Sequence, residues 1–286
     1  MKLKTISPFE AGKVYLLDGG FSTQLSKYVY DVDTDPLWTA RSLVQNKKEV
    51  IKVHRDFISA GARIILTCSY QVSNKLFQEQ LGLDKHQTRE HVIDSVKLAW
   101  QAIQLEAGVR GYQFVAGSVG PYGACLHDGS EYTGDYLQGE DGLSQEELVD
   151  WHRDRIQALQ DGGVSFIAAE TVPMVREALA IMDTVCQVGL LKMWVTFTLK
   201  DKNHLAGGET VQEAVTAVVN HQLSRLDSIL LSKFSTNTGR MSRGRGWGLL
   251  WLKKKDFVQG SIYFLYSHEV APIRLRISSI SGRLEI

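Results

Sequence analysis

Short runs of apolar residues alternate with longer segments of helical periodicity over the first three quarters of the chain. The apolar runs are nearly continuous, as is typical of parallel strands that are buried on both faces. They predict strands at residues 14–18, 63–67, 113–118, 165–170 and 193–198. The segments between them place apolar residues on one helical face and predict helices at residues 48–60, 87–107, 144–160, 174–187 and 209–219.

Local signals mark the ends of two of these helices. Gly61 follows the first pattern at the position where a left-handed residue commonly ends a helix. Ser144-Gln-Glu-Glu147 is a capping-box sequence, in which the serine oxygen accepts a backbone N–H and the glutamate reaches back to the serine. We expect the helix that it opens to end at Gly162-Gly163.

Five successive strand–helix units predict parallel β/α connections, which leave a barrel or a doubly wound open sheet as the main architectures. No Gly-x-Gly-x-x-Gly follows the first predicted strand, which disfavours a dinucleotide-binding open sheet. The long connection at residues 119–143 favours a barrel, because the β-to-α loops of a barrel build its active site. We therefore predict an α/β fold of the (β/α)8 TIM-type barrel class.

The chain changes character after residue 221. Residues 223–286 hold 11 Lys/Arg and 4 Asp/Glu, although the whole chain carries 32 of each kind. Strand-like pieces at residues 227–231, 261–266 and 273–277 have no amphipathic helix between them. We expect a barrel portion at residues 1–221 and a divergent basic, Ser-rich tail at 222–286, so that the barrel is incomplete or irregular after its fifth unit. The tail either supplies substitute strands or is poorly ordered, and a splice variant or a frameshift would produce such a change.

The composition is that of an average soluble protein, with 44% hydrophobic and 22% charged residues. The formal net charge of zero disfavours nucleic acid and anionic membrane as partners. The start has no apolar secretory segment, and no run reaches the ~18 apolar residues of a membrane span. The three cysteines are far apart, which is typical of a reducing compartment. We expect a cytoplasmic protein, and nothing in the sequence indicates its oligomeric state.

Two acidic residues follow predicted strands, and in a barrel they would share one rim. Asp18 precedes Gly19 and Gly20 after the first strand, and Glu170 ends the fourth. Two carboxylates beside a nest of backbone N–H groups suit the ammonium and carboxylate of an α-amino acid. Three alternatives stay open: Asp-Gly-Gly is a simple turn, Glu170 is an ion-pair partner at the rim, or the two acids are those of a glycosidase.

Several longer segments occur in a recognisable order and spacing. They include Leu17-Asp-Gly-Gly-Phe-Ser-Thr-Gln-Leu25, Thr67-Cys-Ser-Tyr-Gln71, Ala116-Gly-Ser-Val-Gly-Pro-Tyr-Gly-Ala124, Asp128-Gly-Ser-Glu-Tyr-Thr-Gly-Asp-Tyr136 and Ala169-Glu-Thr-Val-Pro173. Together they resemble the homocysteine S-methyltransferase family, whose members are zinc-dependent β/α barrels. The resemblance covers about three quarters of the chain.

The resemblance implies roles for residues at matching positions. Asp18, Gly19, Gly20 and Glu170 would bind the amino-acid half of homocysteine, and Tyr70 would be an aromatic residue near the substrate, with a packed rim tyrosine as its alternative. The implied reaction transfers a methyl group from S-methylmethionine or S-adenosylmethionine, both sulfonium ions, to homocysteine, and it yields methionine.

The resemblance also implies Zn²⁺ held by three cysteines, one after the sixth strand and an adjacent pair near the eighth. Cys68, Cys125 and Cys186 do not match these positions, and the chain has no other cysteine. We therefore assign no metal ligand and no catalytic residue, and we expect little or no turnover. The alternative function is a non-catalytic amino-acid-binding isoform, or a partner of a full-length copy.

Overall fold

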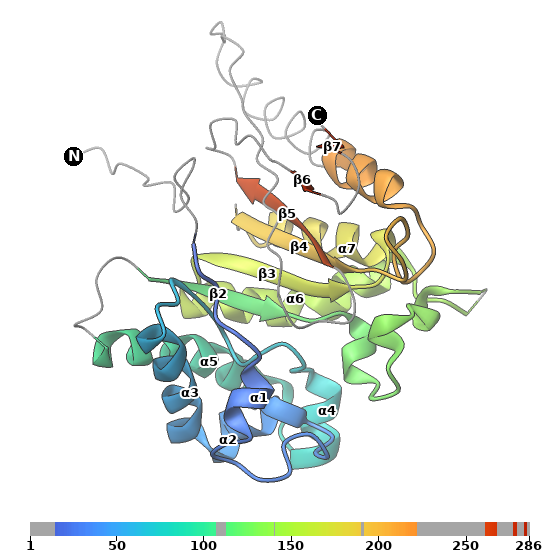
Figure 1. The fold of residues 1–286 in the computed structure, drawn as a ribbon. Coiled ribbons are helices and arrows are strands. Elements are labelled where there is room, and N and C mark those ends of the chain that lie inside the picture. Colours follow the sequence, from blue (N-terminus) through green and yellow to red (C-terminus); the bar gives the residue numbers. More distant parts are fainter. Residues whose placement is uncertain are drawn as a thin grey trace, which may run out of the picture.

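The computed structural model describes residues 15–106, 113–139, 141–189 and 192–221, together with the backbone of three strands nearer the C-terminus (Figure 1). Five strands form one sheet in the order in which they occur along the chain. They are β1 (Ile64–Leu66), β2 (Phe114–Val119), β3 (Phe166–Val172), β4 (Lys192–Thr198) and β5 (Ser261–Ser267). Strands β1 to β4 are parallel neighbours, which confirms the predicted α/β fold with a parallel sheet.

The first predicted strand is present only as a single bridge. Leu17 pairs in parallel with Ile64, beside β1. The other four predicted strands, at residues 63–67, 113–118, 165–170 and 193–198, match β1 to β4 within two residues at each end. Within the described residues, the sheet is open.

β5 lies antiparallel along the whole of β4, from the pair Lys192↔Ser267 to the pair Thr198↔Ser261. A strand was predicted at residues 261–266, and β5 confirms it. Two further short strands, β6 (Ile277–Ser278) and β7 (Arg283–Leu284), form a separate antiparallel pair. The predicted strand at residues 227–231 and most of that at 273–277 lie outside the described residues. The boundary at residues 221 and 222 stays a prediction.

The helices lie on one side of the sheet in Figure 1, with α6 and α7 behind β2 to β4. The α-helices are α1 (Phe21–Leu25), α2 (Ser42–Gln45), α3 (Lys47–Ser59), α4 (Asn74–Leu81), α5 (Lys85–Leu105), α6 (Gln145–Gly162), α7 (Val175–Gln187) and helical residues 211–221. Short 3-10 helices are η1 (Trp38–Arg41), η2 (Tyr122–Cys125), η3 (Ser130–Tyr132) and η4 (Asp135–Leu137). All five predicted helices are present, whereas α1, α2, α4 and the 3-10 helices were not predicted.

The capping-box prediction for α6 is confirmed. The Ser144 hydroxyl accepts from the backbone N–H of Glu147, and the Glu147 carboxylate accepts from the backbone N–H of Ser144. The helix ends at Gly163, whose φ of 86° lies in the left-handed region that favours glycine. None of the described helices combines the length and the apolar content that crossing a bilayer requires.

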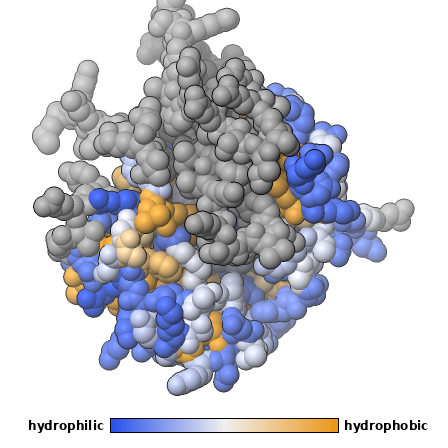
Figure 2. Space-filling model, viewed as in Figure 1, coloured by the Kyte–Doolittle hydropathy of each residue, from blue (hydrophilic) through white to orange (hydrophobic). Residues whose placement is uncertain are grey.

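Successive side chains along each strand point to opposite faces of the sheet, so the strands contribute to two separate apolar cores. Ile65, Val115, Ile167 and Val195 belong to the large core that the sheet forms with the helices. The residues between them face the other side, where Ile64, Ala116, Phe166 and Trp194 form a second apolar layer. The part of the surface visible in Figure 2 is largely hydrophilic, with hydrophobic residues gathered in a few areas. The second apolar layer lies on the face of the sheet opposite the large core, and it packs next to the cavity at the carboxyl ends of the strands.

Candidate functional site

All five predicted site residues line one cavity of about 510 Å³: Asp18, Gly19, Gly20, Tyr70 and Glu170. The cavity lies at the carboxyl ends of the parallel strands. On the face of the sheet that carries the second apolar layer, the side chains change from apolar to polar toward this end. Two residues after Ala116 comes Ser118 on β2, and two residues after Ala168 comes Glu170 on β3. The period of two therefore places polar groups at one end of an otherwise apolar face.

Asp18 is held by the strand beside it. Its side chain is only 6% exposed, and its Oδ2 accepts from the backbone N–H of Leu66 at 2.8 Å. The next residue, Gly19, has no room for a side chain, because a Cβ there would lie 2.8 Å from a ring carbon of Phe57. Gly20 has an ordinary φ of −62° and leads into α1. Close packing at Gly19, rather than a left-handed backbone, is thus what requires glycine in this turn.

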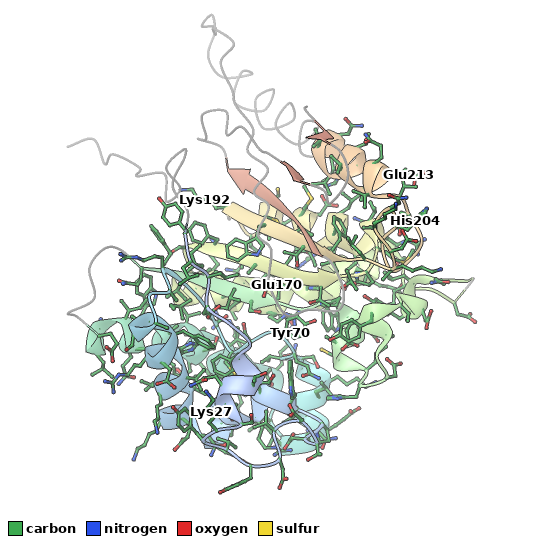
Figure 3. All side chains as sticks on the ribbon, viewed as in Figure 1. Lys27, Tyr70, Glu170, Lys192, His204 and Glu213 are labelled. Carbon is green, nitrogen blue, oxygen red and sulfur yellow. The ribbon has the colours of Figure 1, made fainter. Side chains whose placement is uncertain are left out.

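Tyr70 lines the cavity, and Figure 3 shows it beside Glu170 in the middle of the molecule. Its ring meets the Trp38 ring edge-on, with 6.3 Å between centroids. A Cβ on Gly120 would lie 2.8 Å from the Tyr70 ring, so the loop after β2 must approach this tyrosine closely. Burial raises the pKa of Tyr70 well above its usual value, and nearby carboxylates, including Glu170, raise it further. The phenol is therefore neutral.

Carboxylates dominate the charge of the cavity. Among the described residues that line it, five are Asp or Glu and none is Lys or Arg. Asp35 is paired with Arg41, and Asp33 accepts from the Trp38 indole N–H at 3.1 Å. Burial raises the pKa of Glu131, as expected for a carboxylate that is partly removed from water. The cavity therefore favours a ligand that carries positive charge.

Several lining residues were not predicted. Gln71 and His127 are joined by a hydrogen bond of 2.8 Å between their side-chain Nε2 atoms, and Thr198 lines the cavity from the end of β4. Thr198 ends a predicted strand and Gln71 lies four residues after another, so the rule that points to Glu170 could have found them. His127 lies inside the long loop after β2, where no strand end marks it.

A buried polar cluster lies behind Tyr70, and sequence reasoning missed it as well. Arg155, on α6, donates to the backbone carbonyls of Tyr70 at 2.8 Å, Val72 at 3.3 Å and Gly120 at 2.8 Å. Its guanidinium also lies over the ring of Trp151, 4.6 Å from the centroid. One side chain thereby joins the loop after β1 to the loop after β2.

The same cluster continues through His152 to Glu177. Arg155 Nη2 lies 3.1 Å from His152 Nδ1, and His152 Nε2 lies 3.0 Å from the Glu177 carboxylate. Burial lowers the pKa of His152, so the ring is neutral. A neutral ring has one donor and one acceptor, and here Nδ1 accepts from Arg155 while Nε2–H donates to Glu177. Glu177 also accepts from the Tyr136 hydroxyl and, at 2.6 Å, from the backbone N–H of Tyr122.

The cysteines do not form a metal centre. The Cys68 thiol lies 3.2 Å from the Thr39 carbonyl, and burial raises its pKa to about 12. Burial raises the pKa of Cys125 to about 11. Both thiols are therefore neutral near pH 7. Within the described part of the chain, no three His, Cys, Asp or Glu side chains are grouped so that they could hold a metal ion.

The comparison with known proteins decides the family. The model of the family described as homocysteine S-methyltransferase matches residues 15–232. The chain belongs to this family. The match covers the whole candidate site and extends beyond residue 221. Membership leaves the glycosidase alternative without support.

Curated relatives agree. The chain is 42% identical over 208 residues to a betaine-homocysteine S-methyltransferase from Drosophila melanogaster and 37% identical over 211 residues to the homocysteine S-methyltransferase of Escherichia coli strain K12. These alignments cover 70% and 73% of the chain, and 62% and 66% of the relatives. The chain therefore spans less than two thirds of the length of these relatives.

A solved structure shares the fold. The metallated form of the homocysteine methyltransferase MmuM from Escherichia coli superposes with a TM-score of 0.67 at 36% identity, covering 73% of this chain and 71% of that one.

Proposed function

We propose that the cavity binds homocysteine by its amino-acid end, with the ammonium group at Asp18 and Glu170 and the carboxylate along the backbone of Gly19 and Gly20. The observation that carries the proposal is that residues from three separate segments line one cavity in which carboxylates outnumber cationic side chains. Charge-assisted hydrogen bonds of this kind are about twice as strong as neutral ones. Tyr70 lies beside the bound amino acid as a neutral aromatic wall.

The reaction that this family membership supports is methyl transfer to homocysteine from a sulfonium donor, S-methylmethionine or S-adenosylmethionine. The homocysteine sulfur attacks the methyl carbon, and the bond between that carbon and the donor sulfur breaks. Its electron pair returns to the donor sulfur, the thiol proton goes to solvent, and methionine is formed. The carboxylates of Asp33 and Glu131 and the Trp38 ring give the cavity a negative field that suits a sulfonium cation.

In this proposal, the open parallel sheet corresponds to the first part of a β/α barrel, whose loops at the carboxyl ends of the strands form the site. We propose the cytoplasm as the site of action, because no disulfide joins the three cysteines, all of which lie in the described part of the chain, and that compartment keeps thiols reduced.

A second candidate function is amino-acid binding without turnover. A free thiol has a pKa of ~8.5 and needs activation at neutral pH. The described residues do not fit the family's zinc, because no three His, Cys, Asp or Glu side chains among them are grouped so that they could hold it. No step of the reaction is therefore assigned to a metal in this chain.

Two measurements on the full chain test the proposal and separate the two functions. Isothermal titration calorimetry with L-homocysteine reports binding, and chromatography reports methionine formed from S-methylmethionine with added zinc. Binding with methionine formation supports the transferase, and binding without it supports the binder. If homocysteine does not bind, the proposed site is wrong. The metal content of the purified protein shows whether turnover accompanies bound zinc.

A further inference from the structure

Strained backbone is concentrated at the cavity. Four described non-glycine residues have φ in the left-handed region, and three of them, Trp38, His127 and Thr171, line the cavity. Thr171 is the most unusual, since it is β-branched and has a φ of 63°. A branched side chain in this region crowds its own backbone and is a genuine outlier. Such conformations persist only where the surroundings enforce them, and they are found preferentially at functional sites.

The strain at Thr171 coincides with a β-bulge. Ala169 pairs with Val195 and Val172 pairs with Phe197, so three steps along β3 match two steps along β4. One extra residue therefore lies between Ala169 and Val172. A bulge changes which way the neighbouring side chains point. Here it lets Glu170 and Thr171, which are adjacent in sequence, both line the cavity, while Val172 returns to the large core.

A hydrogen bond ties the bulge to the neighbouring strand. The backbone N–H of Thr171 donates to Thr196 Oγ1 on β4 at 3.1 Å. Thr196 is only 3% exposed. Thr171 and Tyr70 line the same cavity, and the Thr171 side chain lowers the otherwise raised pKa of Tyr70. The strained residue is thus tied to a buried strand position.

We propose that Thr171 is a positioning residue: its strained bulge holds the Glu170 carboxylate toward the cavity so that it meets the substrate ammonium group. This inference rests on the proposed function. It extends that function by naming the feature that makes the site selective for an amino acid over a plain carboxylic acid. In a straight β3 the period of two would still direct Glu170 into the cavity but would send the Thr171 side chain to the helical face, so the bulge fixes where the Glu170 segment lies rather than which face it occupies.

The test uses Thr171→Gly, which keeps every other residue and removes the steric cost of the left-handed backbone. Relief of strain raises Tm by roughly 2–4 °C, while a more mobile bulge weakens ammonium binding. The readout is the ratio of calorimetric Kd values for 4-mercaptobutanoate, which lacks the amino group, and L-homocysteine. We expect this ratio to fall roughly fivefold in Thr171→Gly relative to the unchanged chain. A purely structural residue would not alter this ratio.

Two further variants serve as controls. Thr171→Val keeps the branched side chain and the strain and removes only the hydroxyl, so the ratio stays within twofold. Asp31→Gly relieves a left-handed backbone (φ 59°) at an exposed residue that does not line the cavity, and it leaves the ratio unchanged.

An unchanged ratio in Thr171→Gly, or a loss of Tm together with an unchanged ratio, overturns the positioning role while homocysteine binding stands. A failure of the unchanged chain to bind homocysteine overturns the proposed function itself.

Discussion

Two polar regions lie on either side of Tyr70, and they differ in how their charges are balanced. Behind the tyrosine, Arg155 and Glu177 are linked through a neutral His152, and backbone carbonyls and hydroxyl groups complete their hydrogen bonds. In front of it, the cavity gathers carboxylates without a lysine or arginine among its described lining residues. The first region pairs most of its polar groups internally, with Arg155 Nε left without a hydrogen-bond partner among the described residues, whereas the second holds more carboxylates than cationic side chains.

This difference distinguishes a buried polar cluster that stabilises the fold from one that binds a ligand. Burying charge is costly unless each charge is paired and hydrogen-bonded. A cluster that meets this condition contributes to the fold and to loop positions. A cavity whose lining carries an excess of one charge attracts a ligand of opposite charge.

The largest effect is expected from breaking the buried cluster behind Tyr70 with Arg155→Met. The change leaves three backbone carbonyls and His152 Nδ1 without their donor, so the free energy of unfolding falls by about 3–5 kcal/mol. Urea denaturation measures it. Arg153→Met is the matched control on the same helix, because Arg153 is exposed and its ion pair within the described residues is with Asp150 at 2.8 Å. It changes stability by less than about 1 kcal/mol. Equal losses in both variants would contradict the role of Arg155.

In the cavity, Glu170→Gln removes one of the excess charges. Homocysteine Kd rises roughly 10- to 100-fold, since a charge-assisted hydrogen bond is worth about 1.5–3 kcal/mol. Stability changes little, because a charge is lost from an already acidic cavity. Calorimetry and urea denaturation report the two quantities. Glu79→Gln, on the exposed surface of α4, is the control and keeps the original Kd. An unchanged Kd in Glu170→Gln would mean that the ammonium binds elsewhere.

A smaller effect is expected from Tyr136→Phe, which deletes the hydroxyl that donates to Glu177. Loss of one hydrogen bond to a buried carboxylate lowers the free energy of unfolding by about 1.5 kcal/mol. Tyr30→Phe changes the same chemical group at a residue that is 93% exposed, and stability stays the same. A stable Tyr136→Phe variant would show that Glu177 is satisfied without this hydroxyl.

The smallest effect concerns pH and Glu131. Its pKa is raised in the folded protein, mainly by burial, so folding favours the protonated form. The contribution of this group to stability is complete below the unfolded pKa of ~4.3 and is lost as pH rises through the folded pKa. Glu131→Gln therefore raises the free energy of unfolding at pH 7 by less than about 1 kcal/mol, and the gain vanishes near pH 4.

Glu147→Gln is the control of opposite sign for this pH experiment. Hydrogen bonds from Ser144 lower the pKa of Glu147, so its contribution is present above the unfolded pKa and is lost as pH falls through the folded pKa. Glu147→Gln is therefore destabilising at pH 7, and the difference shrinks in acid. If both variants responded to pH in the same direction, the contrast between the cavity and a satisfied cap would fail.

Much of the scaffold was predictable because it repeats one local rule. Continuous apolar runs and helical periodicity locate β1 to β4, the helix α6 and its Ser144 cap. The cavity residues were predictable for a related reason: the carboxyl ends of parallel strands meet at one edge, so Asp18 and Glu170 had to come near each other. Their roles as substrate ligands stay predictions.

The remaining features depend on contacts that the local pattern does not contain. A one-residue bulge at Thr171 leaves no mark in an apolar run. His152 and Arg155 look like the polar face of an amphipathic helix, and only the packing of α6 on α7 brings them to Glu177. The direction of β5 is equally hidden, because alternation is the same for parallel and antiparallel neighbours.

The position of β5 has a consequence for folding kinetics. β4 ends at Thr198 and its partner begins at Ser261, whereas β1 to β4 are joined by successive β/α units. Contacts between distant segments form slowly, because loop closure costs entropy before any contact is gained. We expect the parallel units to assemble first and β5 to join last. During that interval the free edge of β4 can pair with another chain, so refolding yield should fall with protein concentration.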